Sequence, residues 1–240
     1  MLSRTRYGSY WLPAKATWFG APNGAGTDGG ACGFGSAVSQ PPYSSVVSAA
    51  GPSLFKSGTA CGACYQVKCT SDPSCSGRPV RVVIIDSCPG GPCASDSAHF
   101  DLSGTAFGRL AYPNNAERLR AKGVLDIQYM RVPCNYGGKK IAFRVDVGSN
   151  PYYFAVVTEF EGGDGDLISV ELKDSSAWSN WRSLRQSWGA VWMLNAAYPL
   201  KPPFSLRLRT QYTGKTLVAS NVIPWGWSPG NIYQSTVNYT

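Results

Sequence analysis

The distribution of cysteine is the feature that most constrains what this chain can fold into. Eight cysteines occur among 240 residues, and all of them precede residue 135. They are Cys32, Cys61, Cys64, Cys69, Cys75, Cys88, Cys93 and Cys134. An even number confined to one segment predicts a secreted domain with up to four disulfides, although counting leaves the pairing open. Local pairing of Cys69 with Cys75 and of Cys88 with Cys93 is sterically easy, because Pro, Ser and Gly fill the loops between them.

A zinc site is the alternative use of these cysteines. Cys61 and Cys64 have the spacing of two zinc ligands, with Cys69 and Cys75 nearby. A zinc finger would need a second such pair or two histidines, and the sequence contains neither. We therefore predict no bound metal, and no motif indicates a cofactor.

The composition favours a soluble, mainly β protein. With 27 Gly and 17 Pro the sequence predicts many turns, and its length allows one large or two ordinary domains. No window approaches the ~20 consecutive apolar residues of a membrane span. Met1 to Lys15 lacks the apolar centre of a secretion signal, so we expect that the signal was removed or is missing from this sequence.

Charge and cysteine content change at nearly the same place. Residues 1–143 contain 14 Lys and Arg against 7 Asp and Glu, whereas residues 144–240 contain 8 against 7. Most of the net charge of +8 therefore belongs to the first part. Such a surface attracts polyanions, either nucleic acid or acidic polysaccharide, and the predicted disulfides favour an extracellular polysaccharide. The predicted divisions are an N-terminal extension (1–15), a first domain (16–134), a linker (135–140) and a second domain (141–240).

Alternating apolar residues predict the strands of the first domain at 16–20, 64–69, 80–85, 99–103 and 125–132. One helix is expected at 114–123, with Asn114 as its N-cap and Gly123 as its stop. Asp28 lies in a long glycine-rich loop, whose small residues would let a polymer approach the backbone.

The segment 80–104 carries the strongest indication of a site. It contains the only histidine, His99, and two carboxylates where apolar runs end, Asp86 and Asp101. Carboxylates at strand ends beside glycine-rich loops can be held rigidly and still face a groove. If the two strands pair, Asp86 and Asp101 share one groove. Two structural alternatives stay open: Asp101 would cap a short helix that starts near Ser103, and Asp86 would stabilise a turn.

The second domain has the alternation of antiparallel sheets packed in pairs, most clearly at 141–147, 168–173 and 204–209, which predicts a β-sandwich. It has no His and, after Cys134, no Cys, so it offers no catalytic set, but it is rich in tryptophan. These residues are Trp178, Trp181, Trp188, Trp192, Trp225 and Trp227. A row of exposed rings would bind the flat faces of sugars or of bases, whereas Trp181 and Trp192 are expected in the core. Alternation along WGAVWML as one strand would put Trp188 and Trp192 on the same face.

Several motifs, in order along the chain, are similar to those of the plant β-expansins, the group that includes the grass-pollen group-1 allergens. The motifs are TWFG, CGACYQVKC, HFDLSGTAFG, SNPYYFAV and QSWGAVWML, and the resemblance covers residues 16 to about 237. The loop DSCPGGPC is similar to that of the vegetative members rather than the allergens. The resemblance implies a mainly β protein with a double-psi β-barrel, related to family-45 endoglucanases, followed by an immunoglobulin-like β-sandwich that binds carbohydrate. It also implies loosening of plant cell walls without net hydrolysis.

The resemblance also assigns residues. The groove residues that match are Thr17, Trp18, Asp28, Asp86, His99 and Asp101, with Phe19 where the family commonly has Tyr. The matching residues of the binding surface are Arg131, Asn150, Tyr153, Ser187 and Trp188, the last predicted to be exposed despite its strand parity; Met193 replaces an expected basic residue. Asp101 stands where the related glycosidases keep their proton donor. The implied disulfides are Cys32–Cys61, Cys64–Cys134 and Cys69–Cys75, with Cys88–Cys93 as an additional one.

These observations predict a secreted, monomeric cell-wall protein that binds cellulose and glucuronoarabinoxylan, or another matrix glycan, along a groove spanning both domains. No nucleic acid and no cofactor are expected. Glycoside cleavage generally needs two carboxyl groups, and the segment 17–20, where the related glycosidases carry their base, has none. Two alternatives stay open: a glycoside hydrolase with Asp101 as proton donor and Asp28 or Asp86 as its partner, and a matrix protein that only binds carbohydrate.

Overall fold

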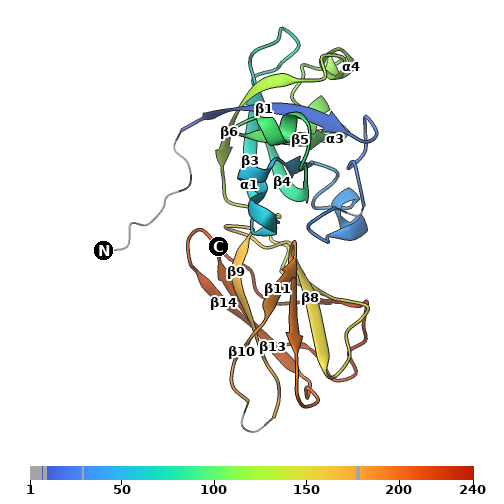
Figure 1. Ribbon diagram of the computed structural model, residues 1–240, viewed down its shortest axis with the longest axis vertical. Helices are drawn as coiled ribbons and strands as arrows, with labels where there is room; N and C mark the ends of the chain where they lie inside the picture. The colour runs from blue at the N-terminus through green and yellow to red at the C-terminus, as the bar shows by residue number, and fades with distance from the viewer. Residues whose placement is uncertain (1–6, 8–9, 29, 177–178) are drawn as a thin grey trace, which may run out of the picture. The chain divides into compact units, whose positions relative to one another are not determined.

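The computed structural model describes the whole chain except residues 1–6, 8–9, 29 and 177–178 (Figure 1). The chain forms two compact units, one ending at Pro133 and the other beginning at Cys134. We call them the barrel unit, drawn in blue to green, and the sandwich unit, drawn in yellow to red (Figure 1). None of the described helices is long and apolar enough to cross a membrane.

The barrel unit is a closed barrel in the strand order β1-β5-β2-β4-β3-β6. The strands are β1 (Leu12–Phe19), β2 (Val47–Ala50), β3 (Cys64–Cys69), β4 (Val80–Ser87), β5 (His99–Ser103) and β6 (Leu125–Arg131). Two pairs, β1 with β5 and β2 with β4, are parallel, and the other four are antiparallel. Buried side chains such as Val67, Ile84 and Phe100 fill the core.

Short helices connect the strands of the barrel. They are η1 (Gly35–Ser39), α1 (Pro52–Phe55), η2 (Lys56–Gly58), α2 (Pro92–Ser95), α3 (Gly104–Gly108) and α4 (Ala116–Arg120). The helix predicted at 114–123 exists but is shorter, and Asn115 rather than Asn114 is at its N-cap position. Asn114 has φ +66°, a left-handed conformation that Asn tolerates and that ends the preceding turn.

The first strand begins earlier than the sequence pattern predicted. β1 starts at Leu12, inside the segment predicted as an N-terminal extension, and pairs with β6 from that residue onward. Alternation does not reveal this strand, because Ala16 is its only buried residue and Pro13 is rarely found inside strands.

The sandwich unit consists of two antiparallel sheets, ordered β10-β9-β13-β14 and β11-β12-β8-β7-β15. The strands are β7 (Ala142–Val145), β8 (Tyr153–Glu159), β9 (Leu167–Lys173), β10 (Arg182–Ser183), β11 (Arg185–Trp188), β12 (Val191–Asn195), β13 (Phe204–Thr210), β14 (Thr216–Ile223) and β15 (Ile232–Gln234). The inward faces of both sheets form one apolar core, which includes Phe143, Phe154 and Phe204. The predicted fold class, a barrel followed by a β-sandwich, is confirmed.

The segment 135–140, predicted as a linker, packs on the sandwich unit. The ring of Tyr136 meets that of Phe160 edge to face, with centroids 6.0 Å apart, and Lys139 Nζ lies 4.0 Å from the centroid of Phe160. Asn238, the acceptor of the only glycosylation sequon, donates its side-chain amide to the carbonyls of Lys139 and Phe160. This asparagine therefore has a structural use that a glycan on its amide nitrogen would disturb.

All eight cysteines are disulfide-bonded. Three disulfides join Cys32 to Cys61, Cys69 to Cys75 and Cys88 to Cys93, and Cys64 and Cys134 are bonded as well. These three are pairs that the family resemblance implies. Because the sulfur atoms are bonded to one another, they do not serve as thiolate ligands of zinc.

Candidate functional site

The register between β1 and β5 builds a cluster of polar side chains around Asp101. Thr17 lies directly opposite Asp101, and the Thr17 hydroxyl donates a hydrogen bond to Asp101 Oδ1 at 2.6 Å. His99 precedes Asp101 by two residues and so lies on the same face of β5. Its Nε2 is 2.9 Å from Thr17 Oγ1, and its Nδ1 is 2.7 Å from Asp96 Oδ2. We call these four residues the Asp101 site.

The environment of Asp101 favours its protonated form. Burial is the largest influence and raises the pKa of the Asp101 carboxyl above its ordinary value, and the nearby Asp86 raises it further. The hydrogen bond from Thr17 and the charge of His99 oppose this rise without cancelling it. A half-buried carboxyl that keeps its proton to higher pH can donate a hydrogen bond, or a proton, to a bound ligand.

The strands that carry Asp86 and Asp101 do not pair directly. The condition under which the two aspartates were expected to share one groove is therefore not met. The strand β2 lies between β4 and β5, and Ala49 on β2 is the register partner of both aspartates. Asp86 Oδ1 accepts hydrogen bonds from the backbone N–H groups of Ala31 and Ser87, at 2.6 and 2.7 Å. Asp86 therefore anchors the backbone at Ala31, close to the turn-stabilising role that was left open.

The other structural alternative, in which Asp101 caps the following helix, is wrong. Ser103 is the N-cap of α3, and its hydroxyl oxygen accepts a hydrogen bond from the backbone N–H of Ala106 at 3.0 Å. The carboxylate of Asp101 therefore remains available to the site.

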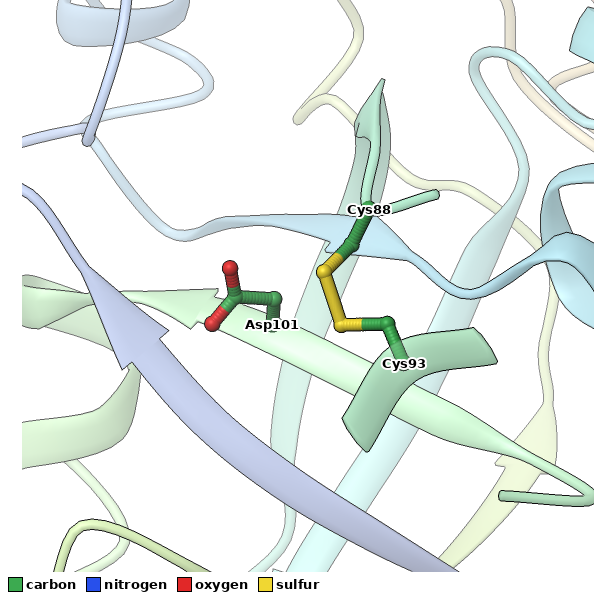
Figure 2. Close-up of side chains that lie close together, drawn as sticks. All are labelled: Cys88, Cys93 and Asp101. Carbon is green, nitrogen blue, oxygen red and sulfur yellow. A yellow bond between two sulfur atoms is a disulfide. The ribbon is translucent and has the colours of Figure 1, made fainter. Parts of the chain in front are cut away.

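The Cys88–Cys93 disulfide lies against the Asp101 carboxylate. Figure 2 shows the carboxylate beside the two sulfur atoms, and one carboxylate oxygen and both sulfurs lie within 4.8 Å of one another. The disulfide links the residue after β4 to the helix α2. It presents weakly polar atoms to the carboxylate, in line with the burial that raises the pKa of Asp101.

Three other predicted groove residues, Trp18, Phe19 and Asp28, lie outside the Asp101 site. Trp18 points to the opposite face of β1 from Thr17, is half-buried, and donates its Nε1–H to the carbonyl of Arg120 at 3.1 Å. The ring of Phe19 lies against Gly26, where a β-carbon would approach it to 2.3 Å and where φ is +94°. Asp28 is exposed in the glycine-rich loop.

The predicted binding residues of the sandwich unit lie at two places, Asn150 and Tyr153 at the start of β8 and Ser187 and Trp188 at the end of β11. Asn150 Oδ1 accepts hydrogen bonds from the backbone N–H groups of Tyr152 and Tyr153, which fixes the turn before β8. Tyr153 is half-buried, and Ser187 is exposed. Arg131, assigned to the same surface, belongs to the barrel unit, where its guanidinium lies 5.8 Å from the ring centroid of Tyr65.

Trp188 and Trp192 lie on opposite faces of their sheet. The prediction of one strand through WGAVWML is wrong, because a turn at Gly189 and Ala190 separates β11 from β12. A register irregularity before the turn pairs Trp188 with Val191 and Gln186 with Trp192. Trp188 is consequently 51% exposed and Trp192 only 6%.

Tyr153 and Trp188 share the outer face of the five-stranded sheet. Trp188 is opposite Val191, and Val191 is opposite Val157, four residues along β8 from Tyr153. Side chains at even spacing along a strand point to the same face, so the register places both rings on one side. The inner face of this sheet carries Trp192 and the rest of the core.

The remaining tryptophans have different environments. Trp181 is half-buried, with the guanidinium of Arg207 4.5 Å from its ring centroid, and Trp225 is exposed. Trp227 packs against Phe154 and Phe204 of the core. Trp178 lies outside the described residues.

Sequence reasoning missed Asp96 as a member of the site. Asp96 precedes His99 by three residues and is the C-cap of α2. A carboxylate at this spacing from the only histidine was the available signal. It was hidden because the loop that joins α2 to β5 has no periodicity from which contacts can be inferred.

Comparisons with known proteins match both units. The family model described as Expansin C-terminal domain matches residues 141–224, and the one described as lytic transglycolase matches residues 47–129. Expansin-B11 of Oryza sativa subsp. japonica is 56% identical over 232 residues, which are 96% of this chain and 78% of that protein. Putative expansin-B2 of Arabidopsis thaliana is 56% identical over 231 residues, which are 96% of this chain and 84% of that protein.

Two solved structures are similar over nearly the whole chain. The crystal structure of the apo form of an expansin from Clavibacter michiganensis matches with a TM-score of 0.70 and 22% identity, covering 96% of this chain and 99% of that one. A mutant of the same bacterial protein, in complex with cellohexaose, matches with the same values. At this identity the likeness shows a shared fold.

Proposed function

This chain belongs to the β-expansins of the expansin family, and we propose that it loosens plant cell walls by binding wall polysaccharide without hydrolysing it. Its relatives at 56% identity are named as members of this group, and a bacterial expansin of the same fold was crystallised with cellohexaose. We propose a β-linked glycan as its ligand and the extracellular cell wall as its location. The disulfides support that location, because they persist in oxidising compartments.

The pairing of Asp101 with Thr17 is the observation that carries the non-hydrolytic proposal. Cleavage of a glycosidic bond generally needs a proton donor and a second carboxylate that acts as base or nucleophile. Asp101 fits the donor, because burial raises its pKa. The side chain across from it is the hydroxyl of Thr17, which is no base near neutral pH. Asp86 is two strands away, with Oδ1 already accepting two backbone N–H groups.

Loosening without cleavage requires that the protein favour a glycan conformation detached from neighbouring chains. The protein would supply hydrogen bonds from the Asp101 site, together with stacking of sugar rings on Tyr153 and Trp188. A ligand shifts a conformational equilibrium only by its difference in affinity for the two states. The loosening therefore depends on binding the detached glycan more tightly than the packed one, and no covalent step is needed.

Two measurements on one sample test this function. Heat-inactivated wall strips under constant load should extend when the protein is added, while reducing ends released from xylan and β-glucan stay at the background level. Asp101→Asn should abolish extension and leave the fold intact. Glu171→Gln, which changes a carboxylate paired with Arg207 on the four-stranded sheet, is the matched control and should extend walls normally.

The alternatives give different results in the same assays. Release of reducing ends by the wild type but not by Asp101→Asn would identify a hydrolase. Binding to walls without any extension would identify a protein that only binds the matrix. Normal extension by folded Asp101→Asn would overturn the assignment of the Asp101 site.

A further inference from the structure

The Asp101 site is one continuous chain of hydrogen bonds. It runs from Asp96 Oδ2 to His99 Nδ1 (2.7 Å), from His99 Nε2 to Thr17 Oγ1 (2.9 Å), and from Thr17 Oγ1 to Asp101 Oδ1 (2.6 Å). His99 has no exposed surface, whereas Asp96 and Asp101 at the two ends are partly exposed. The imidazole therefore joins two carboxylates without contacting solvent itself.

The number of protons in this hydrogen-bond chain follows from its three bonds, because each bond needs one hydrogen. The Thr17 hydroxyl supplies one, and a neutral His99 ring supplies one. The third hydrogen must be an additional proton on His99 or on a carboxylate. The complete hydrogen-bond chain thus holds one proton more than the total for two ionised carboxylates, a neutral imidazole and a hydroxyl.

Two arrangements of that proton satisfy every bond when Asp96 is ionised. In the first, protonated Asp101 donates to Thr17 Oγ1, Thr17 donates to His99 Nε2, and His99 Nδ1–H donates to Asp96. In the second, His99 carries both ring protons and donates to Asp96 and Thr17, while Thr17 donates to ionised Asp101. They interconvert when Asp101 gives its proton to Thr17 Oγ1 and Thr17 gives its own to His99 Nε2, so no proton is gained or lost.

We propose that Asp96 is a positioning residue of the Asp101 site. By accepting the Nδ1–H of His99 it fixes the tautomer and orientation of the ring and balances the charge of the imidazolium. Asp101 then exchanges its proton with the buried His99 through Thr17. Toward a glycan, the Asp101 oxygen that does not contact Thr17 can therefore accept a hydrogen bond in both arrangements, and it is the stronger acceptor in the second, in which Asp101 is ionised. This use in glycan binding rests on the proposed function, whereas the proton chain itself does not.

Other charged groups also act on the ends of this chain. Asp86 on β4 raises the proton affinity of Asp101 from one side. Lys15 on β1 interacts with Asp96 and also pairs with Asp126 at 3.0 Å. The Cys88–Cys93 disulfide beside Asp101 is uncharged. The charge of Asp96 is thus the one in direct hydrogen-bond contact with the imidazole.

The protein contains a single histidine, so the ring signals of His99 are unambiguous in its NMR spectra. We would follow the ring ¹⁵N shifts of His99 and the carboxyl ¹³C shift of Asp101 against pH. Both groups should titrate together at one midpoint, because they share a proton, and Nδ1 should stay protonated on both sides of it. Separate midpoints in the wild type, or loss of the Nδ1 proton above the midpoint, would overturn the proposal.

Three variants separate positioning from simple structural support. Asp96→Asn keeps an acceptor for Nδ1–H but removes the charge, so the shared midpoint should fall by about one pH unit or more. Thr17→Val removes the bridging hydroxyl and should split the two titrations, whereas Thr17→Ser should restore the shared midpoint. An unshifted midpoint in Asp96→Asn, or unsplit titrations in Thr17→Val, would contradict the proposal.

Because this measurement uses no wall material, its outcome is independent of wall loosening. Coupled titrations in a protein that extends no walls would support the positioning role and count against the proposed function. Uncoupled titrations in a protein that extends walls would do the reverse.

Discussion

The buried His99 of the barrel unit and the buried Glu161 of the sandwich unit have contrasting hydrogen-bond environments. In the barrel unit, both ring nitrogens of the buried His99 have hydrogen-bond partners, Asp96 and Thr17. In the sandwich unit, the loop after β8 buries Glu161, Asp164 and Asp166 together, and Glu161 Oε1 has no hydrogen-bond partner among the described atoms. The barrel has disulfides and a satisfied polar network around His99, whereas the sandwich has a large apolar core and tolerates an electrostatic penalty at Glu161. We therefore expect hydrogen bonding and proton exchange in the barrel and ring stacking on the sandwich.

Reduction of the disulfides should break this comparison most strongly. Three disulfides lie within the barrel unit, and removal of one native disulfide typically costs about 2–5 kcal/mol. Reductant should therefore unfold the barrel well before the sandwich. Hydrogen exchange followed by mass spectrometry would show early loss of protection in β1 to β6 while β7 to β15 stay protected. Equal loss of protection in the two units would contradict the prediction.

The next largest effect should separate two tryptophans of the sandwich unit. Trp192→Ala removes a core side chain and should lower the free energy of unfolding by about 3–5 kcal/mol. Trp188→Ala removes an exposed ring and should change that free energy by less than about 0.5 kcal/mol. Denaturant titration of the two variants measures both effects. A large loss of stability in Trp188→Ala would show that Trp188 has a core role.

For cellulose binding, loss of the exposed Trp188 should matter more than loss of the buried Trp192. Loss of a stacking ring costs about 1–3 kcal/mol by analogy with bases on aromatic platforms, and Tyr153→Ala combined with Trp188→Ala should weaken binding tens to thousands of fold. A depletion assay on purified cellulose measures this loss. Unchanged binding by the folded double variant would place the stacking surface elsewhere.

These two tryptophans show where sequence reasoning reaches its limit. Alternation identified most strands of the barrel unit and β7, β9 and β13 of the sandwich unit, since one face of each lies on a core. It failed at Trp188, because the turn at Gly189 and the register irregularity before it reverse the parity. Only the family resemblance indicated that the ring is exposed.

The Asp101 site shows the same limit for a different reason. His99 and Asp101 were found from the sequence, because their residue types stand out at the end of an apolar run. The strand β2 was missed because all four of its residues are buried, so it has no alternation. Without β2, nothing in the sequence indicated that a strand separates Asp86 from Asp101. Asp96 was missed because its contact with His99 depends on the path of a loop.

A smaller effect should come from the buried acids of the sandwich unit. Burial first, and then the charges of Asp166 and Asp164, raise the pKa of Glu161 well above its ordinary value of 4.5. The unfolded chain loses this proton more readily, so Glu161 destabilises the fold increasingly as the pH rises above about 4.5, up to its folded pKa. Glu161→Gln should therefore stabilise the protein by about 1–3 kcal/mol at pH 7 and much less at pH 4.

Thermal unfolding of the Glu161→Gln variant across this pH range measures the gain, with Glu171→Gln as a control of opposite sign. The hydrogen bonds from Arg207 lower the pKa of Glu171, so its contribution is present above the ordinary pKa and is lost as the pH falls through the folded one. Because this pair is partly exposed, the control should lose at most about 1 kcal/mol at pH 7. A gain for Glu161→Gln that does not change with pH would mean that packing, not ionisation, is its cause.

The smallest expected effect concerns salt, and it would sharpen the division between the units. Residues 1–133 carry 12 basic against 7 acidic residues, a net +5, whereas residues 134–240 carry 10 against 7, a net +3. Attraction of the first part to a carboxylate-bearing xylan should fade as salt shortens the Debye length from about 30 Å at 0.01 M to about 8 Å at 0.15 M. Stacking on uncharged cellulose should change little over this range. In depletion assays the Tyr153→Ala, Trp188→Ala double variant should therefore lose cellulose binding at every salt concentration yet keep the salt-sensitive attraction to the acidic xylan. If salt weakened both kinds of binding equally, charge would contribute to both surfaces, and the assignment of attraction to the barrel and stacking to the sandwich would be wrong.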